Sequence, residues 1–118
     1  GIDVYPGFVD AHCHMGLDGY ATGFAGEDYN ELGDPVTPQL SAVDAVNPQD
    51  ETFQMAREGG VTCVCTGPGS SNVIGGTFCA IKTYGKRVDD MLVKEKTAMK
   101  IAFGENPKNC YKEKGVYS

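Results

Sequence analysis

Two histidines separated by one residue, His12 and His14, are the side chains of this chain best suited to chemistry. Neutral imidazole is a common ligand for zinc, iron and nickel. Alternate side chains of a strand lie on the same face, so an extended segment over residues 8–14 directs both rings to one side and Cys13 to the other. This spacing indicates a site for one divalent metal ion. Two surface or core histidines that bind no metal are the alternative.

The residues before the histidines predict the strand that positions them. Residues 4–11 are mostly apolar, which is typical of a strand buried on both faces. Pro6 must lie near the start of this strand, where a missing N–H group does little harm. Residues 15–46 then show no sustained periodicity and are rich in Gly, Asp, Glu and Pro. We expect a long loop there, of the functional or mobile kind.

A helix and a second strand are predicted next. Asn47 suits the N-cap position, Pro48 suits the first helical position, and Gly59-Gly60 ends the helix. Residues 61–66 are rich in β-branched side chains and are bounded by glycines, as in a strand. The order strand, helix, strand indicates a parallel pair with a right-handed connection. We expect further short strands over residues 78–83, 91–93 and 98–103, and a turn or short helix from residue 106.

Composition limits the class of protein. The chain has 118 residues, enough for one small domain at most, and 41% of them are hydrophobic, which is typical of a globular protein. The net charge of −6 argues against a nucleic-acid partner, and no apolar run reaches the roughly 18 residues that span a membrane. Five cysteines, an odd number without a regular framework, favour a reducing compartment. We therefore predict a cytoplasmic protein whose thiols are ordinary buried side chains.

Residues 6–14, with the sequence Pro-Gly-Phe-Val-Asp-Ala-His-Cys-His, closely resemble the first metal-binding motif of the amidohydrolase superfamily. Members of that family are metal-dependent hydrolases on a (β/α)₈ barrel, and the motif places its histidines at the C-terminal end of the first barrel strand, the face where barrel chemistry lies. The resemblance implies that His12 and His14 are metal ligands and that Asp10 supports the local geometry rather than reacting. Residues 58–64 look like the second strand of that family, and residues 67–77, 80–85 and 99–108 are similar to a bacterial branch grouped with imidazolonepropionase-like amidohydrolases.

The resemblance also implies that the site is incomplete. The family adds later histidines, a late aspartate and often a bridging carboxylated lysine, whereas this sequence has no histidine besides His12 and His14. Lys82 and Lys100 are not assigned to the bridging role. A full barrel takes about 250 residues. We therefore expect an α/β fold in which residues 1–118 form a single partial domain, an N-terminal (β/α)₈ (TIM) barrel fragment with about the first three parallel strands, one or two helices and long loops.

For the complete protein, the resemblance implies a hydrolase that cleaves C–N bonds of an amide or amidine, cyclic substrates being favoured, by metal-activated water. Zinc is the favoured metal, with iron or nickel as alternatives. Zinc takes four ligands, so this chain alone is expected to be inactive. The alternative function is a non-catalytic metal-binding or interaction module that retains only the first motif. The expected partners are a small-molecule substrate and either the remainder of the barrel or another copy of the chain, because an incomplete sheet has open edges.

The glycine-rich residues 67–77 do not match the known patterns of a phosphate-binding loop. They lack the Gly-Lys-Ser/Thr of a P-loop, and Asn72 stands where Gly-x-Gly-x-x-Gly requires its third glycine. A loop after a strand can still contact substrate through backbone N–H groups or through the Asn72 side chain. Plain turn structure is the alternative for these residues.

Overall fold

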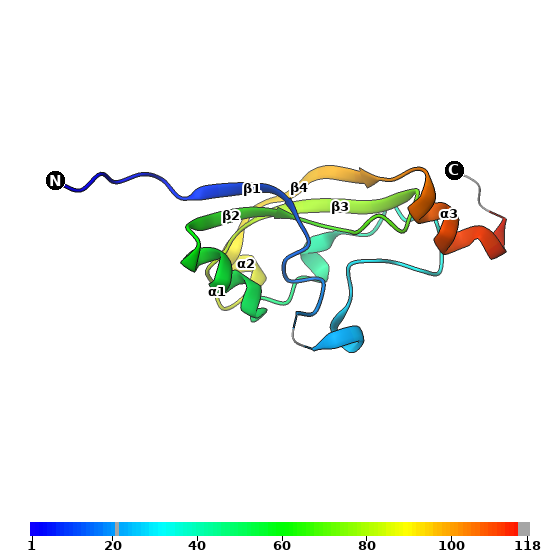
Figure 1. Cartoon of the computed structure of the whole chain (residues 1–118), viewed down its shortest axis with the longest axis horizontal. Coiled ribbons are helices and arrows are strands. Elements are labelled where there is room, and N and C mark those ends of the chain that lie inside the picture. Colours follow the sequence, from blue (N-terminus) through cyan, green and yellow to red (C-terminus); the bar gives the residue numbers. More distant parts are fainter. Residues whose placement is uncertain (21, 116–118) are drawn as a thin grey trace.

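The computed structural model describes residues 1–20 and 22–115, and within them the chain forms a four-stranded mixed sheet (Figure 1). Residue 21, inside the predicted long loop, and residues 116–118 lie outside the described part. Strand β1 pairs with β2 in parallel, whereas β2 with β3 and β3 with β4 are antiparallel. The strands are β1 Phe8–Cys13, β2 Val61–Thr66, β3 Ile74–Lys82 and β4 Leu92–Ile101, in the spatial order β1-β2-β3-β4.

The predicted parallel pair is confirmed, but the prediction of about three parallel strands is wrong. Residues 67–73 alone connect β2 to β3, and a parallel crossover needs a dozen or more residues. The chain therefore returns antiparallel. Three short strands were predicted over residues 78–83, 91–93 and 98–103, but the structure has two long strands there. Strand β3 includes the last part of the glycine-rich segment, and β4 continues through the charged residues 94–96. An edge strand tolerates charges that a central strand would not.

Helix α1, Glu51–Glu58, begins later than predicted. The N-cap is Asp50, whose carboxylate accepts hydrogen bonds from Thr52 N at 2.9 Å and from the Thr52 hydroxyl at 2.7 Å. Asn47, the predicted cap, instead accepts from Gln49 N in the turn before the helix, which places Pro48 outside the helix. The predicted end at Gly59-Gly60 is confirmed. The other helical elements are α2 Val88–Met91, α3 Glu105–Tyr111 and the 3₁₀ turns η1 Gly23–Gly26, η2 Ala42–Asp44 and η3 Lys112–Lys114.

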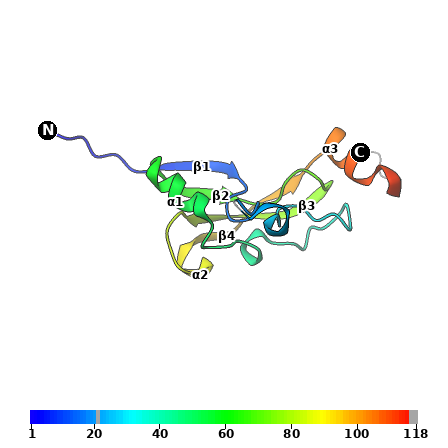
Figure 2. The same ribbon diagram turned by 60° about the horizontal axis from the view of Figure 1, so that its bottom comes forward.

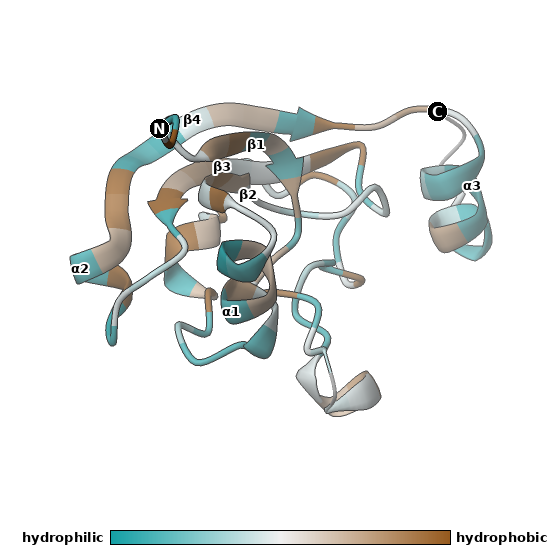
Figure 3. Ribbon diagram, turned by 60° about the vertical axis from the view of Figure 1, so that its left-hand side comes forward, coloured by the Kyte–Doolittle hydropathy of each residue, from teal (hydrophilic) through white to brown (hydrophobic). Residues whose placement is uncertain are grey.

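The core lies on one face of the sheet. The elements on this side of the strands are helices α1 and α2, the turn η2 and the long segment between β1 and α1 (Figure 1, Figure 2). Phe53 from α1 packs with Val64, Cys79 and Ile81 from the sheet, and hydrophobic residues are concentrated on the strands, as Figure 3 shows. None of the helices in the described residues is long and apolar enough to cross a membrane.

The segment 15–46 is attached to the sheet at several points. Val36 and Ser41 form isolated bridges with Ile74 and Thr77 of β3. Leu17, near the start of the segment, is 2% exposed and belongs to the core cluster. This segment therefore covers the core face and brings its own residues close to the ends of β1 and β2.

Strand β1 is less buried than its apolar sequence predicts. Phe8 and Val9 are 73% and 67% exposed, and residues 1–7 form no strand. They project beyond the sheet, at the end opposite to α3 (Figure 1, Figure 2). Among the described residues β1 is an edge strand, so one side of its backbone has no neighbouring strand there. That the remainder of a barrel or a second copy of the chain covers this edge stays a prediction.

The cysteines are free thiols, and Cys63 and Cys79 are buried as predicted, whereas Cys110 is exposed. Burial is the main cause that raises the pKa of Cys79 to about 11 from 9, and the neighbouring Cys65 and Cys13 thiols raise it further. The folded state thus favours the neutral thiol.

We expect the free energy of unfolding to be unaffected by Cys79 below pH 9 and to fall by up to about 3 kcal/mol as pH rises from 9 to 11. Urea unfolding at several pH values measures this decline. Cys79→Ala should show a smaller decline over the same interval, and equal slopes for the two proteins would refute the assignment.

Candidate metal centre

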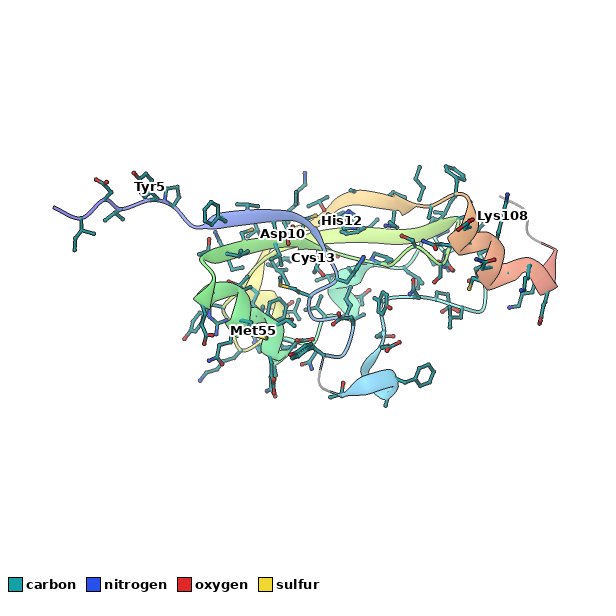
Figure 4. All side chains as sticks on the ribbon, viewed as in Figure 1. Tyr5, Asp10, His12, Cys13, Met55 and Lys108 are labelled. Atoms are coloured by element: carbon teal, nitrogen blue, oxygen red, sulfur yellow. The ribbon has the colours of Figure 1, made fainter. Side chains whose placement is uncertain are left out.

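His12 lies in a bulge at the end of β1. Asp10 pairs with Val64 and Cys13 pairs with Thr66, so the chain advances three residues on β1 while it advances two on β2. Bulges of this kind redirect side chains and are common beside active sites. The backbone N–H of His12 donates to the Asp10 carboxylate at 3.1 Å, which ties the acid to the local backbone. Figure 4 shows Asp10, His12 and Cys13 in succession along this strand.

His14, directly after β1, is oriented by the end of β2. Its Nδ1 lies 2.6 Å from the carbonyl oxygen of Gly67. A carbonyl oxygen can only accept, so Nδ1 carries the proton and the neutral ring leaves Nε2 free as an acceptor. Histidines that bind metals typically donate their second ring N–H to a carbonyl or carboxylate in this way.

The two imidazole rings meet at the ends of β1 and β2. Their centroids are 5.5 Å apart, and the ring planes are at 85° to each other. Zinc binds imidazole nitrogen at about 2.1 Å, which places the ion roughly 3 Å from each ring centre and limits two ligating rings to centroids about 6 Å apart. The observed separation meets that limit. Cys13, between the histidines in sequence, packs against the core instead.

The described residues bring no further candidate ligand to the two imidazoles. They contain no group of three or more His, Cys, Asp or Glu side chains placed to hold one metal ion. Lys82 is exposed on β3, and Lys100 is half-buried on β4. The separation of the two imidazoles, 5.5 Å between centroids, is short enough for both rings to reach one metal ion.

Gly67 is hydrogen-bonded to Cys13 and His14, and the sequence patterns did not indicate this role. Its N–H donates to Cys13 O at 3.2 Å, while its carbonyl accepts from His14. A Cβ at this position would lie under 3.0 Å from three atoms of the Phe78 ring. That ring in turn contacts His12 edge-on, with centroids 5.2 Å apart. In the sequence, the only indication of this close approach is that a glycine directly follows a strand rich in β-branched residues.

Asn72 is a structural residue, so of the two alternatives for the glycine-rich loop its side chain does not support substrate contact. It is 2% exposed. Its amide donates to the Thr37 hydroxyl at 2.9 Å, and its carbonyl oxygen accepts from the Tyr111 hydroxyl. Both ends of the side chain are therefore occupied inside the protein.

Comparison with known proteins places this geometry in context. No family model matches the chain. The crystal structure of an amidohydrolase from Thermotoga maritima MSB8 has a TM-score of 0.89 and 47% sequence identity over 93% of this chain. This chain is similar to a segment of an amidohydrolase.

A second protein gives the same result. Amidohydrolase tasK of Hapsidospora irregularis is 34% identical over 116 residues, which cover 89% of this chain. The chain spans 29% of the Thermotoga amidohydrolase and 12% of tasK. The similarity therefore concerns one segment of these longer proteins.

Proposed function

We propose that this chain forms the first part of the active site of a metal-dependent amidohydrolase, with His12 and His14 as ligands of one divalent metal ion. The observation that carries the proposal is the convergence of the two rings, with centroids 5.5 Å apart. The similarity to segments of two amidohydrolases supports the class of reaction.

The residues of this chain have distinct roles in the proposed site. His12 and His14 hold the ion, and the Gly67 carbonyl keeps the His14 Nε2 available. Asp10 fixes the bulge that carries His12. A bound divalent metal supplies a Lewis acid and makes water nucleophilic at neutral pH. Zinc is favoured, with iron or nickel as alternatives, and the remaining ligands come from segments beyond the described residues.

We further propose that the substrate is an amide or amidine whose C–N bond is hydrolysed, with cyclic substrates favoured. The resemblance of residues 67–77, 80–85 and 99–108 to an imidazolonepropionase-like branch supports this finer assignment. A segment with two of the metal ligands is expected to bind an ion weakly and to catalyse nothing by itself.

Metal titration tests the proposal. Zinc or cobalt(II) added to this chain is expected to bind with one ion per chain in isothermal titration calorimetry. The variant His12→Ala/His14→Ala contains no histidine, and its affinity is expected to fall by about tenfold or more, since loss of outer-shell partners alone costs about 10–100-fold.

A control is needed because exposed carboxylates bind cations unspecifically. Asp89→Asn removes one exposed acid on α2, away from the histidines, and should bind as the unmodified chain does. Equal affinity of the unmodified chain and the double variant would remove His12 and His14 from the proposed site.

A further inference from the structure

Tyr29 lies against the face of the His14 ring. The two ring centroids are 5.6 Å apart, and the planes differ by 29°, which is a stacked arrangement. Tyr29 is half-buried and packs against the core cluster. It comes from the long segment between β1 and α1, whose sequence signalled no specific residue for the site.

The backbone of Tyr29 is held on both sides. Its carbonyl accepts from Gly69 N at 2.7 Å, and the preceding residue, Asp28, donates its N–H to Leu17 O at 2.7 Å. A Cβ on Gly69 would lie within 3.0 Å of Tyr29 and Asn30 side-chain atoms, so the loop after β2 lies directly against this residue. Tyr29 is therefore fixed between the end of β1 and the loop that carries Gly67.

The hydrogen bond to Gly67 does not fix the tilt of the His14 ring plane. A single N–H···O contact fixes the position of Nδ1, but the ring can still tilt about that contact. A flat neighbour on the ring face removes the tilt, because stacked aromatic rings favour near-parallel planes. Hydrogen bond and stack together determine where Nε2 points.

We infer that Tyr29 is a positioning residue for the proposed metal site, which it orients through His14. The expected effect of Tyr29 on metal affinity rests on the proposed function. The orientation of the His14 ring by Tyr29 is a property of the metal-free chain. It gives the segment 15–46 a role in the site besides covering the core.

The direct test is proton NMR of the metal-free chain. The His14 ring stacks on the Tyr29 ring, so its protons should resonate upfield of their positions in the urea-unfolded chain, and nuclear Overhauser contacts should join the two side chains. The chain has two histidines, so His12→Ala assigns the signals. The absence of both effects in the unmodified chain would overturn the inference, whatever any variant does.

Variants separate the ring from the hydroxyl. Tyr29→Phe keeps the aromatic face and should preserve both the upfield shift and the zinc affinity. Tyr29→Leu keeps an apolar side chain but loses the ring, so the shift should disappear and zinc affinity should fall about three- to tenfold, the range expected for one aromatic contact. Tyr20→Leu, at a half-exposed tyrosine of the same segment, is the matched control and should change neither.

The outcomes distinguish this inference from the proposed function. Zinc affinity of Tyr29→Leu equal to that of the unmodified chain would refute the positioning role while His12 and His14 could still bind. Failure of the unmodified chain to bind zinc, with the NMR effects intact, would refute the proposed function and leave the orientation of His14 by Tyr29 standing. Loss of affinity in Tyr29→Phe equal to that in Tyr29→Leu would assign the effect to the hydroxyl and refute the stacking argument.

Discussion

Gly67→Ala is expected to lower the free energy of unfolding by about 1–3 kcal/mol and to weaken metal binding at the candidate centre by about tenfold or more. The added Cβ would lie under 3.0 Å from three atoms of the Phe78 ring. That ring is 5% exposed and rests edge-on against His12, so it cannot move aside freely. Relief by a backbone shift would displace the carbonyl that accepts from His14 Nδ1.

The matched control is Gly59→Ala. Gly59 has a φ of −83°, and a Cβ there would make ordinary contacts of 3.5 and 3.7 Å with backbone oxygens. This variant is expected to be neutral or slightly more stable, because it restricts the unfolded chain. Urea unfolding and zinc titration measure both effects, and a Gly67→Ala protein that matches Gly59→Ala in stability and affinity would contradict the role assigned to Gly67.

Tyr111→Phe is expected to cost about 1–3 kcal/mol of stability, because it leaves the buried Asn72 carbonyl oxygen without its donor. Tyr111 is fully buried, and its hydroxyl lies 2.8 Å from Glu31 O, 3.1 Å from Asp34 O and beside the Asn72 carbonyl oxygen. The single hydroxyl proton serves one of these oxygens at a time. The residue joins α3 to the long segment and to the loop after β2.

The same variant should change the response to alkali. Burial, with smaller contributions from Cys110, Glu31 and Asp34, raises the pKa of Tyr111 to about 12 from 10. The stabilisation is complete below pH 10 and is lost as pH rises toward 12, because the unfolded chain loses the proton first. Urea unfolding across this interval should show a steeper decline for the unmodified chain than for Tyr111→Phe.

Tyr84→Phe is the control for this experiment, since Tyr84 is 74% exposed. It should retain the stability of the unmodified chain at neutral pH and the same alkaline decline. A Tyr111→Phe protein that behaves like Tyr84→Phe in both measurements would show that the buried hydroxyl does not hold α3 in place.

Local sequence patterns predicted the elements nearest to the candidate centre. The strand before His12, the helix that ends at Gly59-Gly60 and the parallel strand over residues 61–66 were all predicted, because each depends on residues close in sequence. The start of α1 was misplaced, since Asn47 and Asp50 are both good capping residues. Only the structure shows which of them accepts from the helix backbone.

The direction of β3 and β4 and the burial of β1 could not be predicted from these patterns. Alternation and β-branched content identify a strand but do not say which way it runs. The connection over residues 67–73 is too short for a crossover because β3 already begins at Ile74, inside the glycine-rich segment. Apolar residues in β1 predicted burial, whereas Phe8 lies at an open sheet edge.

The sequence by itself determined the pair of imidazoles and the extended backbone that carries His12, because residue type and a spacing of two suffice for both. The tertiary structure decided what surrounds the pair. The Gly67 carbonyl that orients His14 is 53 residues away along the chain, and the rings of Tyr29 and Phe78 come from a loop and from an antiparallel strand. Contacts of this kind depend on the path of the whole chain through space, and no local periodicity encodes that path.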